Sequence, residues 1–308
     1  MAYFETKYTL EVKSAAVTAL DYDFATSAPY TALLEPQTAP LRVLSGLIVA
    51  TSGHQTAFGL GEGVVAYVPH DYEATLEVEK DRAGINKYLY QVHEIYLVRK
   101  PPAVSHELAT SAVAGGLKCL TALHYSLQVL SGEAILISGG GTIGELAAQF
   151  ALSLGLRVFT MGLKGDKDQR FKALQSEDIP RVLLSETGGL GVNHILDFSE
   201  SHTPQTKRTL LQCLGVRGKW ALCDLSFQLD PPEALQLFLR CGAVCFVNEE
   251  AWLQTGLEHG KLLQLLTVIL GKVEQGLIEP KVTEIMSIAS IAEARLKARQ
   301  GVVVIKPL

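Results

Sequence analysis

The sequence predicts an α/β protein in which a mostly antiparallel, barrel-like unit of short strands precedes a doubly wound parallel sheet. The first hundred residues hold short strand-like runs separated by glycines. After Gly132, strands and helices alternate, which is typical of a parallel sheet covered on both faces. Within that stretch, residues 135–144 join a strand to a helix through closely spaced glycines. These three observations define the expected fold class.

The composition is that of a folded protein with no charged partner. Of 308 residues, 48% are hydrophobic and 19% charged, and the net charge is −5. No basic face appears, so we expect no direct nucleic-acid binding. No apolar run reaches membrane-spanning length, and the first residues lack a cationic start and an apolar core, so we expect no membrane insertion and a cytoplasmic protein. The five cysteines lack a C-x-x-C pair, which indicates free thiols in a reducing compartment.

The predicted strands of the first part are defined by alternation and by glycine or proline punctuation. Residues 8–13 alternate between apolar and polar, and Lys100 with the two prolines after it closes the series. The expected strands cover residues 8–13, 44–50, 63–68 and 88–98.

The second part opens with a helix and continues with the alternating pattern. Ser105 is a plausible N-cap for a helix over 105–125, with a kink expected at Gly115 and Gly116. Strands are then predicted at 134–138, 157–161, 181–184, 194–198, 219–223, 243–247 and 302–305, and helices at 144–154, about 168–175, 205–214, 261–275 and 291–299.

The glycines between the first parallel strand and its helix have the spacing of a dinucleotide-binding Rossmann loop. Gly139 permits a tight turn, Gly141 lets the backbone approach a pyrophosphate, and Gly144 lets helix and strand pack closely. The helix N-terminus, including Thr142 and Ile143, offers N–H groups to the phosphates. The alternative is a turn that merely connects strand and helix. Glu145, in the expected first turn, opposes a bound pyrophosphate unless it points outward.

The end of the next strand favours NADP(H) over NAD(H). An acid that binds the ribose 2′-hydroxyl is expected about 20 residues after the glycines, but Gly162 occupies this position. Lys164, Lys167 or Arg170 can neutralise a 2′-phosphate there. The alternative for these cations is the solvated start of a helix.

On these motifs the sequence resembles the medium-chain dehydrogenase/reductase superfamily, and within it the zinc-free quinone oxidoreductases related to zeta-crystallin. The similar segments cover nearly the whole chain: residues 10–21, an F-x-x-G-D-x-V-like turn at 58–65, the Thr-Ala pair at 121–122, a T-G-G-x-G-V-like segment at 186–193 with 195–197, residues 228–232 and 246–252.

The resemblance implies a domain organisation and a reaction. It implies a GroES-like substrate domain over 1–107, completed by 263–308, and a Rossmann domain over 108–262. The GroES-like domain is expected to be short at its N-terminus, because the chain begins where family members have completed an initial strand. A homodimer through Rossmann edge strands is implied, as is hydride delivery from a nicotinamide to a quinone or activated alkene.

The positions of zinc ligands in metal-dependent relatives hold residues that do not bind zinc. Residues 17–19 replace the first cysteine, and Leu44, Ser45 and Gly46 replace the G-H-E motif. His93 and Glu94 lack the H-E-x-x-H spacing. No metal is therefore expected.

Few side chains qualify as catalytic groups. Tyr22 could donate a hydrogen bond to a carbonyl oxygen, or could simply pack. Thr121 could contact the nicotinamide, or serve a helix kink, and Asn248 could bind the carboxamide or the substrate. His124 is interpreted as structural.

Two functions from different classes remain. The first is an NADPH-dependent reductase of quinones or enones. The second is a catalytically degenerate dimeric subunit of a larger protein assembly, which the resemblance implies to be endosome- and messenger-RNA-associated. The second rests on Glu145, the short barrel and the scarcity of catalytic side chains.

Overall fold

The fold was derived from a computed structural model. It describes residues 6–18, 41–52, 57–163, 170–174, 178–199, 201–224, 226–298 and 301–307. The chain divides into two compact units, one of Met1–Leu117 with Glu250–Leu308 and one of Lys118–Glu249. The substrate and nucleotide roles expected for 1–107 with 263–308, and for 108–262, remain predictions.

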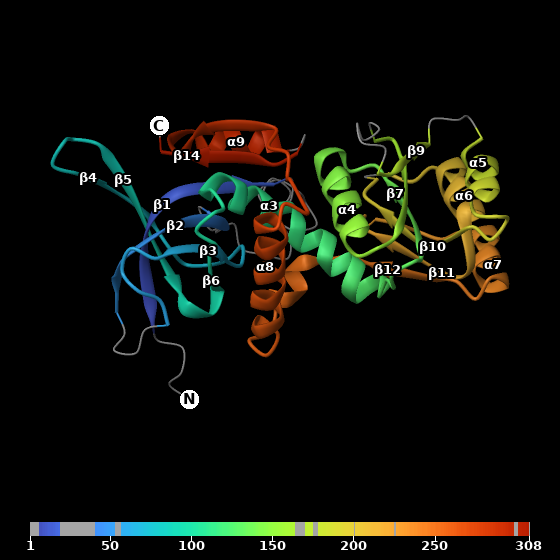
Figure 1. The fold of residues 1–308 in the computed structure, drawn as a ribbon, viewed down its shortest axis with the longest axis horizontal. Helices are drawn as coiled ribbons and strands as arrows, with labels where there is room; N and C mark the ends of the chain where they lie inside the picture. The colour runs from blue at the N-terminus through green and yellow to red at the C-terminus, as the bar shows by residue number, and fades with distance from the viewer. Residues whose placement is uncertain are drawn as a thin grey trace. The chain divides into compact units, whose positions relative to one another are not determined.

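The first unit is built on an eight-stranded, mostly antiparallel sheet (Figure 1). Its strands follow the order β13-β14-β1-β2-β3-β6, and β5 pairs with both β1 and β4. Only the β13–β14 pair is parallel among the described strands of this sheet. The strands are β1 (Lys7–Val17), β2 (Val43–Thr51), β3 (Gly63–Tyr67), β4 (Leu76–Lys80), β5 (Asn86–His93), β6 (Leu97–Arg99), β13 (Glu284–Ser287) and β14 (Val303–Lys306).

Strand β1 organises this sheet because it pairs along both edges. One edge pairs with β2, while the other is shared between β5, over Lys7–Glu11, and β14, over Ala15–Val17. The two strands β1 and β2 approach closely at Gly46, where an added Cβ would lie 2.3 Å from the carbonyl oxygen of Glu11. The C-terminal strand is thereby joined to the N-terminal sheet.

Helix α3 (His106–Leu120) begins in the first unit and ends in the second. Ser105 is its N-cap as expected, since its Oγ accepts a hydrogen bond from Leu108 N–H at 3.1 Å. The helix runs without a break through Gly115 and Gly116, so the kink expected there stays a prediction. The irregularity comes later, as a π-helical turn over Thr121–Leu127. The first unit also contains α8 (His259–Glu274), α9 (Ile291–Lys297) and the 3₁₀ turns η1 (Glu94–Tyr96) and η4 (Ile288–Ser290).

The second unit contains a six-stranded parallel sheet in the order β12-β11-β10-β7-β8-β9. Figure 1 shows α4 on one side of this sheet and α5, α6 and α7 together on the other. This is the doubly wound arrangement, so the predicted fold class is confirmed. The elements are β7 (Ala134–Ser138), α4 (Gly141–Ser153), β8 (Arg157–Met161), β9 (Lys172–Leu174), α5 (Ile179–Glu186), β10 (Val192–Asp197), α6 (Pro204–Cys213), β11 (Leu214–Leu222), α7 (Pro231–Leu239) and β12 (Ala243–Phe246).

Two predicted elements of this sheet are wrong. The helix expected at about 168–175 is a strand over Lys172–Leu174 in its described part, and the strand expected at 181–184 is helix α5. Asp178 starts α5, because its side chain accepts a hydrogen bond from Arg181 N–H at 3.2 Å and a proline follows in the first helical turn. The apolar run read as a strand buries Leu183 on one face of this helix.

Other elements were missed or divided differently. Strands β4 and β13 and helix α7 were not predicted, and the single strand expected over 88–98 is two strands joined by a 3₁₀ turn. In the described ranges, no helix is long and apolar enough to span a bilayer.

Candidate functional site

The parallel sheet has a switch point between β7 and β10. Connections from these neighbouring strands run in opposite directions, which leaves a crevice at the carboxyl ends of strands where ligands bind in such folds. Gly139 follows β7 directly, and Phe198 follows β10. The predicted glycine loop therefore lies at the switch point.

The backbone of this loop requires glycine. Gly139, Gly140 and Gly141 have φ of +67°, +84° and +49°, in the left-handed region. An added Cβ at Gly144 would lie 2.2 Å from the carbonyl oxygen of Gly139, so α4 packs directly on the turn. At Gly141, by contrast, an added Cβ would meet no atom within 4 Å. The third glycine is thus needed for packing, while the second is open toward solvent.

The N-terminus of α4 has the features of an anion site. Gly140 caps the helix without a side-chain hydrogen bond, so backbone N–H groups of the first turn are available. Thr142 lies in that turn, and its Oγ1 is buried without a hydrogen-bond partner in the described protein. Because α4 starts at Gly141 and not at 144, Glu145 belongs to the second turn. The carboxylate is therefore farther from the helix end than the sequence suggested.

The end of β8 forms the other wall of the loop. Gly139 N–H donates to the carbonyl of Met161 at 3.0 Å, and Gly162 has a φ of +76°. Gly162 stands at the position where an acidic residue is expected, as noted from the sequence. Arg170 is exposed, whereas Lys164 and Lys167 lie outside the described residues.

A buried aspartate–histidine–aspartate chain adjoins the loop and was not predicted. His202 Nε2 lies 2.8 Å from Asp197 Oδ2, and its Nδ1 lies 3.0 Å from Asp224 Oδ2. Burial opposes ionisation of Asp224, but hydrogen bonds from Ser226 and His202 prevail and hold its pKa below the usual range. Each ring nitrogen of His202 therefore lies within hydrogen-bond distance of one carboxylate oxygen. Trp220 Nε1 also donates to Asp197 at 3.2 Å.

This chain fixes the segment that follows β10 against the glycine loop. Asp197 Oδ1 accepts from Ser199 N–H at 3.0 Å. A Cβ added at Gly140 would lie 2.9 Å from the Phe198 side chain, and one added at Gly139 would lie 3.6 Å from Ser199. His202 therefore holds in place the segment after β10 that forms one side of the expected nucleotide site.

An ion pair places the candidate residues Thr121 and Asn248 in the same region of the second unit. Lys118 Nζ lies 3.4 Å from Glu249 Oε1, and both side chains are largely buried. Thr121 follows Lys118 by one helical turn and is buried, while Asn248 precedes Glu249 and is exposed. The π-helical turn that starts at Thr121 packs against β11 and β12. Tyr22 lies outside the described residues.

Cys119 and Cys223 lie near this ion pair and are not activated thiols. Burial raises the pKa of Cys223 to about 12 and also raises the pKa of Cys119. A thiol with a raised pKa is a poor nucleophile at neutral pH. Neither cysteine therefore qualifies as a catalytic group.

The replaced zinc-ligand positions are parts of strands. Val17 ends β1, and Ser45 lies in β2, where its Oγ donates to the carbonyl of Val64 at 2.8 Å. Across the part of the chain that the structure describes, no group of three His, Cys, Asp or Glu side chains could hold a metal ion.

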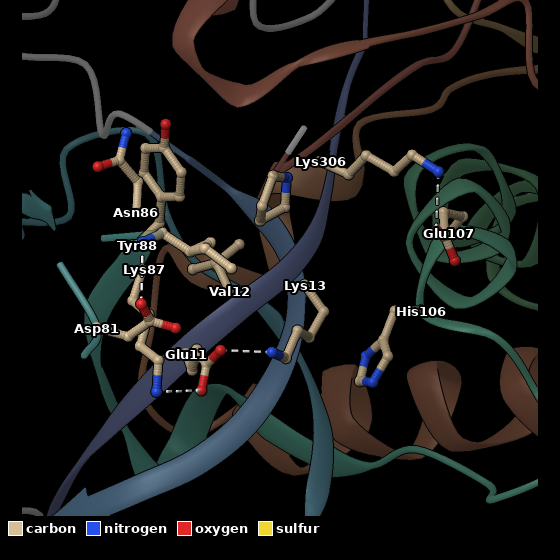
Figure 2. Close-up of a pocket in the computed structure, with 12 residues that line it drawn as sticks. Glu11, Val12, Lys13, Asp81, Asn86, Lys87, Tyr88, His106, Glu107 and Lys306 are labelled. Atoms are coloured by element: carbon tan, nitrogen blue, oxygen red, sulfur yellow. Dashed lines mark hydrogen bonds and ion pairs between the residues drawn. The ribbon is translucent and has the colours of Figure 1, made fainter. Parts of the chain in front are cut away.

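A separate cavity of about 540 Å³ lies within the first unit (Figure 2). Its charged lining is largely paired: Glu11 binds Lys13 and lies 3.8 Å from Lys87, and Lys306 lies 3.5 Å from Glu107. Paired charges of both signs do not select a ligand of one charge.

His106, at the wall of this cavity, has a defined tautomer. Ser45 donates its single hydroxyl proton to Val64, so it must accept from His106 Nδ1 at 2.7 Å. Burial, followed by Lys100, lowers the pKa of His106 to about 4. His106 is therefore neutral at pH 7, with Nδ1 protonated.

Comparison with curated proteins identifies the family. Quinone oxidoreductase-like protein 1 of Mus musculus is 30% identical over 268 residues, which cover 79% of this chain and 74% of the relative. The chain belongs to the quinone oxidoreductase branch of the medium-chain dehydrogenases/reductases. The resemblance stated from the motifs is thus confirmed. No family model matches the chain.

Solved structures of this superfamily share the fold. An alcohol dehydrogenase superfamily protein of Novosphingobium aromaticivorans superposes with a TM-score of 0.79 at 18% identity, covering 97% of this chain and 91% of its own. A mycobacterial protein solved in complex with NADPH gives a TM-score of 0.72 at 21% identity, covering 98% and 92%.

Proposed function

We propose that the chain is an NADP(H)-dependent oxidoreductase that reduces a quinone or an activated alkene such as an enone, without zinc. The observation that carries the proposal is the glycine loop at the switch point, with its three left-handed glycines and the buried Thr142 hydroxyl beside an uncapped helix N-terminus. Membership in an oxidoreductase family supports it.

The residues present fit a dinucleotide. Backbone N–H groups of Thr142 and Ile143 would bind the pyrophosphate, and Thr142 Oγ1 would gain a hydrogen-bond partner that the described residues do not supply. Gly141 leaves room for the phosphates. Gly162 repels no 2′-phosphate, which Lys164, Lys167 and Arg170 would bind as a cationic group. NADPH is therefore the proposed form.

Bound NADPH would supply hydride to the electron-poor carbon or oxygen of the substrate, and one proton completes the two-electron reduction. Thr121 and Asn248 are proposed to orient the nicotinamide end and the substrate by hydrogen bonds. The Tyr22 hydroxyl is proposed to donate to the substrate oxygen on which negative charge develops. The chain itself positions the reactants and excludes water.

Turnover is the test of this proposal. NADPH oxidation is followed at 340 nm against a panel of benzoquinones, naphthoquinones and enals, with NADH and without acceptor as controls. We expect acceptor-dependent oxidation of NADPH with a rate on the order of 1 to 1000 per second for the best acceptor. Combined Lys164→Ala, Lys167→Ala and Arg170→Ala substitutions should raise the KM for NADPH and leave that for NADH unchanged. A panel without any turnover would refute the enzymatic proposal.

A homodimer through the edge of the parallel sheet is also proposed. Strand β12 pairs with β11 along one edge, and Phe246 at its end is 59% exposed. An exposed sheet edge offers backbone groups to a second strand. Analytical ultracentrifugation should give a dimer whose dissociation constant rises at least tenfold in Phe246→Lys. A monomeric parent protein would exclude this arrangement.

The degenerate-subunit function stays as the second candidate. It is favoured by large apolar side chains on the outer face of α7 that the second unit itself does not cover: Leu235, Phe238 and Leu239. An inactive protein that binds partners there would support it over the enzymatic proposal.

A further inference from the structure

The second unit has an apolar surface at the end of its sheet where the parallel strands start, opposite to the end that carries the glycine loop. Five exposed side chains form what we call the α7 surface, and each is at least 56% exposed: Leu190, Val216, Leu235, Phe238 and Leu239. Leu190 precedes β10, Val216 lies near the start of β11, and the others lie on α7. Starts of parallel strands lie opposite the carboxyl ends where Gly139 lies, so this surface is separate from the proposed nucleotide site.

Backbone contacts join the three segments that carry these side chains. A Cβ added at Gly215 would lie 2.6 Å from the carbonyl oxygen of Leu190, so the segments before β10 and at the start of β11 are in contact. Arg217 N–H donates to the carbonyl of Arg240 at 2.7 Å, which joins the residue after Val216 to the end of α7.

Helix α7 is held firmly by its other face, so the exposed face is a fixed feature. Glu233 and Leu237 point inward and are buried. The buried Lys207 binds Glu233 at 2.8 Å and Asp230 at 3.0 Å, which anchors the first turn of the helix (Figure 1 shows α7 beside α6). Gly242 N–H donates to the carbonyl of Leu237 at 2.8 Å and anchors the last turn.

A cavity of about 430 Å³ opens at the part of the α7 surface formed by Leu190 and Val216, which both line it, whereas no residue of helix α7 does. Glycine backbone forms much of the wall, at positions 132, 189, 191 and 215. A recess lined by exposed apolar side chains can bury a large side chain of a partner, as in the central pockets of protein interfaces.

The charge around this surface is positive although the chain is acidic. Arg157, Arg217 and Arg240 form no ion pair with any residue in the described ranges. Of the neighbouring carboxylates, Glu186 is paired with Lys172 at 2.7 Å, and Glu133 accepts a hydrogen bond from His194 at 2.8 Å, so the three arginines outnumber the unpaired acids.

Arg217 also has a φ of +59°, a left-handed conformation that non-glycine residues rarely adopt. Local strain of this kind persists where the surrounding structure holds it, and it is found at binding sites. Val216, next to it in the chain, is 76% exposed, and Arg217 itself is exposed with no ion pair to any described residue.

We propose that the α7 surface docks an acidic amphipathic helix of a partner protein. Apolar side chains at i, i+3, i+4 and i+7 of that helix would cover Leu235, Phe238 and Leu239, with one large side chain in the adjacent cavity. Its flanking Asp and Glu would pair with Arg157, Arg217 and Arg240. A second copy of this chain fits less well, because a two-fold contact brings the same arginines face to face.

The test selects peptides from a display library of random 20-residue sequences on the full-length protein, in parallel with Phe238→Ser, Arg217→Glu and two controls. Leu257→Ser removes an exposed apolar side chain in the first unit, and Arg208→Glu inverts an exposed charge on α6. Urea unfolding confirms that each variant is folded. We expect enrichment of acidic sequences with helical apolar spacing on the parent and both controls, with at least tenfold less on Phe238→Ser and Arg217→Glu.

Binding of the selected peptides is then measured by fluorescence anisotropy at 50 and 500 mM NaCl. Binding should weaken with salt for the parent protein and change little for Arg217→Glu, because exposed ion pairs are screened. The proposal is overturned by three results: no enrichment, enrichment of peptides without acidic residues, or equal enrichment on Phe238→Ser. It is also overturned if sedimentation shows self-association that Phe238→Ser abolishes, because the second copy is then the occupant. None of these readouts depends on nucleotide binding, so the docking proposal and the proposed reaction fail separately.

Discussion

Two alanine substitutions in the glycine loop should separate folding from nucleotide binding. In Gly144→Ala the new methyl group lies 2.2 Å from the Gly139 carbonyl oxygen and 3.1 Å from Leu163. Overpacking of this kind costs about 3 kcal/mol, and the helix propensity of alanine returns about 1 kcal/mol. The expected net loss is about 2 kcal/mol of unfolding free energy, since a backbone carbonyl cannot move as a side chain can.

In Gly141→Ala the new methyl group meets no atom within 4 Å, and only the φ of +49° is unfavourable. The expected loss is about 1 kcal/mol. The methyl group does occupy the space through which the phosphates approach, so NADPH affinity should fall at least tenfold. Gly141→Ala should therefore be folded and poor in nucleotide binding, whereas Gly144→Ala should be less stable.

Urea unfolding followed by tryptophan fluorescence measures the difference, because Trp220 is buried in the second unit. A Trp252→Phe background isolates its signal. Two results would refute the reasoning: an unfolding midpoint of Gly144→Ala equal to that of the parent, or unchanged NADPH affinity in Gly141→Ala.

Three further predictions concern buried titratable side chains. His202→Ala should lower the unfolding free energy by about 3 kcal/mol, because it removes a hydrogen-bond partner of the fully buried Asp197; a loss below about 1 kcal/mol in urea titrations would show that this hydrogen bond is not needed for stability. His106 should stay neutral down to about pH 4, and because its unfolded pKa near 6.5 is higher, stability should fall by on the order of 1 kcal/mol, after solvent screening, as pH drops from 6.5 toward 4. His106→Gln should remove this slope, and an NMR titration midpoint of His106 near 6.5 would disprove the shift. Lys207→Ala should destabilise the second unit by about 3 kcal/mol, since Glu233 stays buried, and an unchanged Trp220 unfolding transition would show that the pair is not needed.

Much of the second unit could be predicted because its local signals agree. The apolar strands, the glycine spacing and the alternation of elements all indicate a doubly wound sheet, and each follows from short stretches of sequence. The N-cap at Ser105 could likewise be predicted from the sequence. Helix α7 could have been found too, because Asp230, two prolines and Glu233 form a helix-start signal, and Asp230 N–H donates to Glu233 at 2.7 Å.

The remaining features depend on tertiary contacts. The π-helical turn after Thr121 packs on β11 and β12, and nothing in its own sequence favours a wider turn over the expected kink at two glycines. A strand was predicted where α5 lies and a helix where β9 lies, because a short apolar run does not distinguish a helix from a strand. The Asp197–His202–Asp224 chain joins residues from different loops, so no local spacing reveals it. The same holds for the α7 surface, since sequence alone does not show which apolar residues stay exposed.

Calorimetric titration measures whether the glycine loop binds NADP(H). The parent protein and Gly141→Asp, which places a negative charge where the phosphates approach, are titrated with NADPH and with NADH. We expect saturable binding of NADPH, at least tenfold weaker binding of NADH, and no binding by a folded Gly141→Asp. A parent protein that binds neither nucleotide would contradict it and leave the chain as a non-enzymatic member of its family.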